Sequence, residues 1–432
     1  MNNIINYKLI SFLLSWIFPT KETRRAFRTL CNTIEDEKET PKIFKRYKKI
    51  IKKIAKKKQI RVIFLISENS KWKAQSLFDL MDKSEKFEPI IALTVLKGVH
   101  KGEDITRNNI DEDYNYFRNK GMQVVLAYED NKFLDLKNFN PDIVFYQQPW
   151  DISKLQSPKE VSKYALTYYI PYYVNNYELQ PIEYEQELHR FVYKYFVLNK
   201  WWEDEYKRKS NLNNVVGLGN PILDNFRQNN NHDKDKNYVI YAPHYSFFHE
   251  LNKNPVNYGT FLENGELILG FAQEHKEYNW VFKPHPQLKF ALYKVWGKDK
   301  TDKYYMDWEN IGLACYDSSY IELFKKSKLL ITDCDSFLLE YFCTTNPIIH
   351  LISPKCSINP SEFSKNIFDS FYKVKTNEEL FASLDEILIK NNDFKKESRN
   401  MALKKSNLLN SYAAQNIIDE ILKDVDIKNI EV

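Results

Sequence analysis

Short apolar runs alternate with amphipathic stretches along most of the 432-residue chain. The apolar runs predict buried strands, and the amphipathic stretches between them, such as 73–83 and 111–120, predict helices. This alternation is typical of βαβ units around parallel sheets. The expected strands lie at 60–67, 89–96, 122–128, 142–146, 165–170, 192–198, 215–218, 238–242, 280–283, 311–316, 328–332 and 347–352.

A polar, low-complexity run at 226–237 interrupts the alternation and predicts a linker between two α/β domains that face each other across a cleft. Ligands of open α/β sheets bind beyond the carboxyl ends of the strands, so functional residues are expected in the loops that follow strands. The division that we expect is an N-terminal segment 1–58, a Rossmann-like acceptor domain 59–225, a Rossmann-like nucleotide-donor domain 238–376, and a helical C-terminal region 377–432.

The N-terminal segment carries two signals for a membrane surface. Residues 4–18 are mostly apolar but too short to span a bilayer, and residues 42–61 hold eleven Lys or Arg and no acid. Within the basic stretch, Ile43, Tyr47 and Ile50 repeat at helical spacing, which predicts a basic amphipathic helix. Such a helix either lies on anionic lipid or leads, solvated, into the first strand. The adjacent apolar stretch favours peripheral attachment to a membrane.

Composition argues against a nucleic-acid-binding protein, a Rossmann dehydrogenase and a Walker NTPase. The net charge is only +5, which is unlike a protein that binds nucleic acid by neutralising phosphates. Only 10 residues are glycine, and Ile222 stands where a dinucleotide fingerprint beginning at Gly217 needs its third glycine. The five cysteines include no C-x-x-C pair, which fits a reducing, cytoplasmic compartment. Carboxylate pairs are few, so we expect no metal and no cofactor.

Two histidines follow strands of the second domain. His244 stands in Ala-Pro-His after 238–242, and His285 stands in Lys-Pro-His-Pro after 280–283. Their neighbouring prolines stiffen the backbone that aims each ring. We expect both to be catalytic, by proton transfer or by phosphate contact, with a structural role equally open for His244. Lys283 adds positive charge for a diphosphate.

A third motif leads from the strand at 328–332 through a polar turn into an apolar helix. Asp335 or Ser336 suits the N-cap, and the free N–H groups of a helix start bind phosphate oxygens. Glu340 lies one turn further on, where it can accept hydrogen bonds from a ribose; ordinary helix capping is the alternative. The expected nucleotide- and phosphate-binding residues are Lys283, Ser318, Ser319, Asp333, Asp335, Ser336 and Glu340.

Loops that follow the first-domain strands, at 68–72, 147–151 and 172–176, mix aromatic and amide side chains. This mixture suits a sugar or polyol acceptor, and it also suits plain loop packing. The expected acceptor-side residues are Glu68, Asn69, Trp72, Gln148 and Asn175.

The second-domain motifs resemble the CDP-glycerol glycerophosphotransferase family of teichoic acid and capsule polymerases, over roughly residues 140–352. Ile-Pro-Tyr and Tyr-Gln-Gln-Pro stretches are similar to a capsule-locus branch. The stretches that carry the resemblance are Ala-Pro-His at 242–244, Lys-Pro-His-Pro at 283–286, Thr-Asp-Cys-Asp-Ser-Phe-Leu-Leu-Glu-Tyr at 332–341, Gly-Asn-Pro-Ile-Leu-Asp at 219–224, Tyr-Gln-Gln-Pro at 146–149 and Ile-Pro-Tyr at 170–172.

The resemblance implies a GT-B fold, attachment to the inner membrane face, and transfer of glycerol phosphate from a CDP-activated donor to a hydroxyl of a surface glycopolymer, with release of CMP. It implies that His285 contacts the donor pyrophosphate or assists the leaving CMP, and that Asp333 and Ser336 lie in the nucleotide loop. It also implies that Glu340 lies near the ribose. The implied partners are a nucleotide-activated donor, a polysaccharide or lipid-linked acceptor, and an anionic membrane surface.

The chain departs from the family in its first domain. The family has a Trp-His-Gly whose histidine is taken as the general base, and the corresponding stretch here, 169–175, has no histidine. Asp335 also replaces a serine, and Ile222 stands where an arginine is common. Either His244 supplies the base or the substrates differ. The alternatives are therefore a GT-B glycosyltransferase that uses a nucleotide-sugar and, third, a membrane scaffold without activity.

Overall fold

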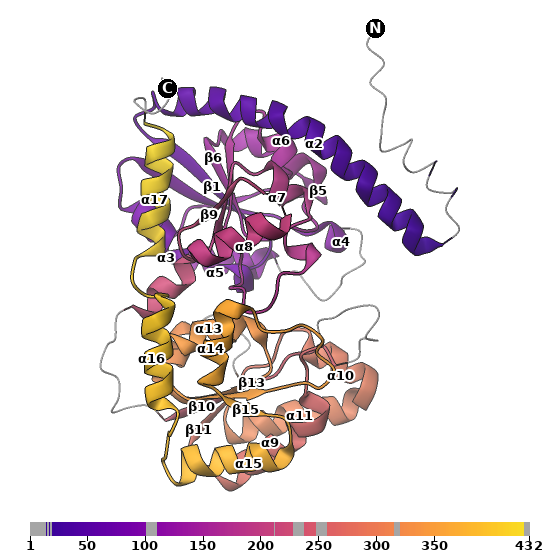
Figure 1. The fold of residues 1–432 in the computed structure, drawn as a ribbon, viewed down its shortest axis with the longest axis vertical. Coiled ribbons are helices and arrows are strands. Elements are labelled where there is room, and N and C mark those ends of the chain that lie inside the picture. The colour runs from indigo at the N-terminus through magenta and orange to yellow at the C-terminus, as the bar shows by residue number, and fades with distance from the viewer. Residues whose placement is uncertain are drawn as a thin grey trace.

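The computed structural model describes residues 14, 17, 20–100, 110–210, 212–227, 237–247, 257–314 and 320–426. It contains two parallel sheets, one above the other in Figure 1, each covered by helices. The first sheet has the order β3-β2-β1-β6-β7-β8-β9, with all neighbours parallel. Its strands are β1 (Ile60–Ile66), β2 (Phe87–Leu93), β3 (Val124–Leu126), β6 (Ile143–Tyr146), β7 (Leu166–Tyr169), β8 (Lys194–Val197) and β9 (Val215–Gly217).

The second sheet has the order β12-β11-β10-β13-β14-β15 and is also parallel throughout. In both sheets the first strand lies in the middle and the order reverses beside it, which confirms two doubly wound domains. Every strand predicted from the apolar runs is present. The strands of the second sheet are β10 (Tyr238–Ala242), β11 (Asn279–Phe282), β12 (Leu313–Ala314), β13 (Ser327–Thr332), β14 (Ile348–Leu351) and β15 (Tyr372–Val374).

Three details of the strand prediction need correction. Helix α11 (Lys298–Ile311) continues into the stretch predicted as a strand at 311–316, and β12 is only two residues long. Strand β15 was not expected, because a lysine in its centre breaks the apolar run. A small hairpin of β4 (Tyr128–Glu129) and β5 (Lys132–Phe133) was also missed, although Asp130 and Asn131, both at positive φ, form the type of turn that hairpins use.

Helices lie between successive strands of both sheets, as connections between parallel strands require. The helices of the first domain are α2 (Lys21–Ile54), α3 (Gln75–Asp82), α4 (Lys97–His100), α5 (Ile110–Asn119), α6 (Pro158–Val161), α7 (Glu187–Phe191) and α8 (Lys200–Ser210). Those of the second domain and C-terminal region are α9 (Phe261–Glu274), α10 (Leu288–Trp296), α11, α12 (Ile321–Lys326), α13 (Asp335–Phe342), α14 (Glu362–Asp369), α15 (Asn377–Leu384), α16 (Lys396–Ser406) and α17 (Ala413–Asp424).

The apolar face of the basic N-terminal helix is part of the first-domain core. Ile43 and Tyr47 are fully buried, and the Tyr47 hydroxyl donates to the carbonyl of Phe191 at 2.7 Å. The interpretation that this apolar face lies on lipid was therefore wrong. The helix leads into β1, as the alternative interpretation expected, but its apolar face packs in the core and is not solvated. The opposite face stays basic, because Lys45, Lys48, Lys49, Lys52 and Lys53 are all exposed, and the turn that follows the helix adds the exposed Lys56 and Lys58.

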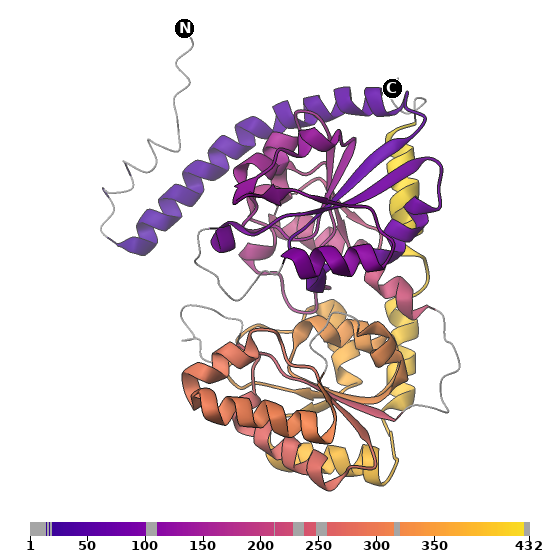
Figure 2. The same cartoon turned by 180° about the vertical axis from the view of Figure 1, so that it is seen from behind.

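The chain returns to the first domain at its C-terminus, where α16 lies on the second domain and α17 on the first (Figures 1 and 2). Asp224 fixes α17 by accepting hydrogen bonds from the N–H groups of Ala413 at 2.8 Å and Ala414 at 2.9 Å. Gly219, at φ +104°, lies so close that a Cβ there would be 2.6 Å from the Cβ of Ala413. The Gly-Asn-Pro-Ile-Leu-Asp stretch at 219–224 is thus the surface against which α17 packs.

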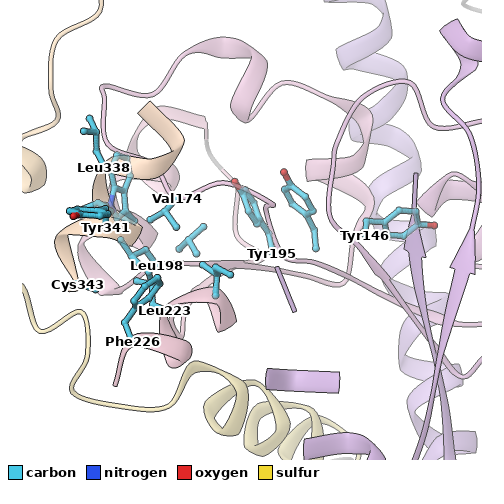
Figure 3. Close-up of a cluster of buried hydrophobic side chains, with 14 of the residues drawn as sticks. Tyr146, Val174, Tyr195, Leu198, Leu223, Phe226, Leu338, Tyr341 and Cys343 are labelled. Carbon is cyan, nitrogen blue, oxygen red and sulfur yellow. The ribbon is translucent and has the colours of Figure 1, made fainter. Parts of the chain in front are cut away.

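An apolar cluster joins the two domains. Leu223 and Phe226, from the short helix η5 (Pro221–Phe226), belong to one buried cluster with Leu338 and Tyr341 of α13, and Figure 3 shows these side chains close together. An apolar interface of this kind holds two domains in a defined arrangement. No helix within the described ranges is long and apolar enough to cross a membrane.

Candidate functional site

The two predicted histidines meet at the carboxyl edge of the second sheet. His244 follows β10 and His285 follows β11, and their ring centroids are 4.8 Å apart. The loops that carry them are joined by a hydrogen bond from the His285 N–H to the carbonyl of Pro243, at 3.0 Å. The tilted ring of Tyr245 lies 4.5 Å from that of His285. The strand-end argument therefore placed both imidazoles correctly.

Backbone donors define the tautomer of each imidazole. The N–H of Gln287 donates to Nδ1 of His285 at 3.1 Å, and the N–H of Ser246 donates to Nδ1 of His244 at 3.2 Å. A ring nitrogen that accepts a hydrogen bond carries no proton, so we infer that each neutral ring holds its proton on Nε2. The two rings then offer Nε2–H donors, which suits contact with phosphate oxygens better than removal of a proton from a hydroxyl.

Asp333 ties the loops of the second domain together. One carboxylate oxygen accepts the His244 N–H at 2.6 Å, and the other accepts the N–H and the hydroxyl of Thr260 at 2.6 and 2.8 Å. Burial raises the pKa of Asp333 to about 6, although the three donors favour its ionised form. Its side chain therefore positions the histidine loop.

Helix α13 begins at Asp335, earlier than the sequence suggested. The N-cap is Cys334, whose side chain makes no capping hydrogen bond, so the expectation of Asp335 or Ser336 at this position was wrong. The Ser336 hydroxyl lies 3.2 Å from Cys334 Sγ. Asn176 of the first domain donates to the Asp335 carboxylate at 2.6 Å, and burial raises the pKa of Asp335 to about 7. Ser318 and Ser319 lie outside the described residues.

Glu340 is fully buried and contacts the first domain. Its Oε1 lies 3.3 Å from Nζ of Lys73, and its Oε2 accepts a hydrogen bond from the hydroxyl of Tyr320. Lys73 also donates to that hydroxyl, and Nζ of Lys283 lies 5.5 Å from the centroid of the Tyr320 ring. Glu340 thus contacts a lysine and a tyrosine where the sequence suggested a ribose. Lys73 and Tyr320 were missed, because no local spacing marks a contact between domains.

The predicted acceptor residues fall into two groups. Trp72 is only 7 % exposed and packs edge-on against Phe64 and Phe117, so its ring belongs to the core. The other four line the edge of the first sheet through hydrogen bonds and ion pairs with nearby residues. These contacts are Glu68 with Lys71 at 2.5 Å, Asn69 N–H with Asp113 at 2.7 Å, Gln148 with Ser67 and Lys71 at 3.0 and 2.8 Å, and Asn175 with Glu183 at 2.5 Å.

The site as a whole is suited to an anion. Two Nε2–H donors, the ammonium groups of Lys73 and Lys283, and the start of α13 come from loops at the facing edges of the two sheets. Burial raises the pKa of three carboxyl groups in the same region, to about 6 for Asp333, about 7 for Asp335 and about 8 for Glu183. Within the described residues, no three His, Cys, Asp or Glu side chains gather as metal ligands would.

No protein-family model matches the chain, and no curated protein is similar to it. Solved structures do match. A variant of the wall teichoic acid polymerase TagF is 13% identical, with a TM-score of 0.54, over 96% of this chain and 100% of that one. The S. aureus MnaA–UDP co-structure is 14% identical, with a TM-score of 0.50, over 84% and 96% of the two chains. A UDP-N-acetylglucosamine 2-epimerase is 12% identical, with a TM-score of 0.53, over 85% and 96%.

At these identities the likeness shows the fold. Together with the two doubly wound sheets, it establishes a GT-B-like architecture of two Rossmann-like domains. The site residues of this chain must be argued from their own contacts.

Proposed function

We propose that this protein is a nucleotide-dependent transferase of surface-glycopolymer synthesis, which moves glycerol phosphate or a related polyol phosphate from a CDP-activated donor to an acceptor hydroxyl. The observation that carries the proposal is that His244 and His285, whose ring centroids lie 4.8 Å apart at the carboxyl ends of β10 and β11, each accept a backbone hydrogen bond at Nδ1, from which we infer an Nε2–H donor on each ring. The GT-B-like fold supports it, since the structure of the TagF variant soaked with CDPG has the same architecture at a TM-score of 0.51.

In the proposed reaction, the acceptor oxygen bonds to the β-phosphorus while the bond from that phosphorus to the bridging oxygen breaks. CMP leaves with the bridging oxygen, and the hydroxyl proton passes to a carboxylate. Catalysis of such a step is mainly positioning and charge stabilisation. His285 and His244 donate from Nε2 to phosphate oxygens, and Lys283 neutralises the charge that develops on the leaving group.

The base in this scheme is Asp335 in place of His244. Its pKa of about 7 gives it a substantial ionised fraction at neutral pH and enough basicity to take a proton in the transition state. Its hydrogen bond to Asn176 holds the carboxylate toward the acceptor domain. Asp335 thereby serves as the general base in place of the Trp-His-Gly histidine of the family that the sequence resembles, which this chain lacks.

The test is a thermal-shift panel of CDP-glycerol, CMP, UDP-sugars and GDP-sugars, followed by an assay of CMP release. A selective shift with the cytidine compounds and loss of turnover in His285→Ala support the proposal. His275→Ala is the matched control, because His275 lies before β11, at the opposite edge of the same sheet. Normal CMP release by His285→Ala would refute the role of this ring.

A nucleotide-sugar transferase is the second candidate, and one observation favours it. Among the first-domain side chains that the structure describes, the one histidine is His189, which is fully buried between the rings of Tyr169 and Tyr195. Burial lowers the pKa of His189 to about 3, so it is a neutral core residue. A uridine or guanosine shift, with release of UDP or GDP, would establish this alternative.

We also propose peripheral attachment to the inner face of the membrane through charge. The seven exposed lysines, five on the outer face of α2 and two in the turn after it, each contribute about 1 kcal/mol near an anionic surface at low salt. Because the apolar face is buried, attachment needs no insertion of this helix, and it should weaken steeply with ionic strength. The test is sedimentation with vesicles that contain phosphatidylglycerol. At a salt concentration where the wild type sediments with the vesicles, the double variant Lys48→Glu/Lys52→Glu should stay in solution. Equal sedimentation would refute the proposal.

A further inference from the structure

A cavity lies at the carboxyl ends of β14 and β15, beside the histidine pair. Its volume is about 280 Å³, at the lower end of ligand pockets, so it can hold one ring-sized unit. Tyr177, Tyr258 and Phe368 contribute aromatic walls, and His350 and Lys375 also line it. The ring of Tyr177 lies 5.3 Å from that of Tyr258 and 5.6 Å from that of Phe368.

Both domains build this cavity. Tyr177 comes from the first domain, and its segment pairs with residues 359–361 of the second domain through two backbone hydrogen bonds of 2.9 Å. These run from the N–H of Glu178 to the carbonyl of Asn359, and from the N–H of Ser361 to the carbonyl of Asn176. The acceptor-side domain therefore supplies one wall of a cavity that otherwise belongs to the second domain.

His350 lines the cavity and has a buried polar atom that no hydrogen bond in the described residues explains. The residue is 5 % exposed, and its Nδ1 is buried with no hydrogen-bond partner in the described structure. Buried polar atoms are almost always paired, and leaving one unpaired costs about 1–3 kcal/mol. Burial lowers the pKa of His350 to about 4, so at neutral pH the ring is neutral and can exchange hydrogen bonds with a hydroxyl group.

The cavity also adjoins the proposed reaction centre, and its lining includes the carboxyl of Asp333 and two lysines. Tyr258, which forms one wall, lies 5.7 Å from the ring of His244 in an edge-to-face contact. Lys373 and Lys375 are exposed and line the cavity on the β15 side. Lys373 is paired with Asp369 at 2.5 Å. A ligand in the cavity would thus have one end at His244 and an anionic group within reach of lysine.

We infer that this cavity binds the terminal unit of the acceptor: one sugar or polyol unit that bears a phosphate or a carboxylate. The inference rests on the proposed function and adds the chemical class of the acceptor. The aromatic walls pack against the carbon skeleton of the unit, His350 meets a hydroxyl, and Lys375 meets the anion. The unit's free hydroxyl then faces the histidine pair.

The first experiment measures CMP release by the full chain at varied acceptor and at varied CDP-glycerol. In Lys375→Glu the KM for a glycerol-phosphate trimer should rise about two- to fivefold, and in Tyr177→Ala about tenfold, while the KM for the donor is unchanged. Lys365→Glu is the matched control, because Lys365 is exposed on α14 and does not line the cavity. A rise in the donor KM alone would overturn the inference and place the donor in the cavity.

The second experiment does not need turnover. The glycerol-phosphate trimer, a galacturonic acid trimer and a neutral galactose trimer are tested for binding by ligand-observed NMR. Binding of one or both anionic trimers, reduced in Lys375→Glu, supports the cavity even where no CMP is released, which separates it from the proposed function. Equal binding of all three trimers, or anionic binding unchanged in both cavity variants, would overturn the inference.

Discussion

Replacing Lys73 by methionine should destabilise the protein far more than removal of a surface ion pair. Lys73 is the cation that faces Glu340 across the domain interface, with side-chain exposures of 6 % and 0 %. Methionine keeps most of the aliphatic volume and removes the charge. Of its contacts with Lys73 and Tyr320, Glu340 would then keep the hydrogen bond from Tyr320.

The magnitude follows from the geometry. At 3.3 Å and an effective dielectric constant of about 20, two unit charges attract by about 5 kcal/mol. Breaking a buried pair from one side usually costs about 3–5 kcal/mol, because the remaining charge stays desolvated. We expect Lys73→Met to lower the free energy of unfolding by about 3 kcal/mol. The double variant Lys73→Met/Glu340→Gln should recover a large part of this loss, since it leaves no buried charge.

The assay is urea unfolding followed by tryptophan fluorescence and by circular dichroism, to establish that both domains unfold together. The matched control is Lys303→Met, which breaks a shorter pair, 2.8 Å from Asp307, whose lysine is 70 % exposed. That variant should lose less than about 1 kcal/mol. The reasoning would be refuted if Lys73→Met lost less than about 1 kcal/mol of the free energy of unfolding. It would also be refuted if the loss in the double variant equalled the sum of the losses in the two single variants.

Two further predictions concern Gly219, against which α17 packs, and the buried acid Glu183. Gly219→Ala should cost about 2 kcal/mol in urea unfolding and expose the segment before α17 to protease, because φ is +104° and Ala413 lies in the way. Gly270→Ala, in the open middle of α9, should instead stabilise by about 0.5–1 kcal/mol. Since burial raises the folded pKa of Glu183 to about 8, its neutral form is favoured, and stability should fall as pH rises from 6 to 9. Urea midpoints of Glu183→Gln should change less over that range, and an equal change would contradict the assignment.

The sequence was sufficient for the sheets because their signal is local. Buried parallel strands such as β1 and β13 are continuous apolar runs, and their alternation with helices predicts parallel sheets but not the order of the strands. The meeting of His244 and His285 could be predicted for the same reason, since carboxyl ends of neighbouring parallel strands share an edge. Each of these inferences needed information from only a few residues on either side.

What the sequence could not supply depends on partners far along the chain. Lys73 and Glu340 are separated by 267 positions, which follows from their numbers, and nothing near either residue indicates that they pair. The amphipathic helix 42–54 illustrates the same point, because an apolar face fits a membrane or a sheet equally well. Only the packing of Ile43 and Tyr47 in the first-domain core decides between them.

Two of the three acids that the sequence assigned to nucleotide binding contact first-domain side chains: Asp335 contacts Asn176, and Glu340 contacts Lys73. Under the proposed function, a ribose that hydrogen-bonds to Glu340 must take the place of Tyr320, because Oε1 already faces Lys73. The donor diphosphate brings new negative charge to the same region. If Lys73 turns to a phosphate, Glu340 is left as a buried charge without its cation, at the cost of about 3–5 kcal/mol that also applies to Lys73→Met unless the carboxyl takes up a proton. Under the proposed function, donor binding would therefore be linked to the Lys73–Glu340 contact between the domains.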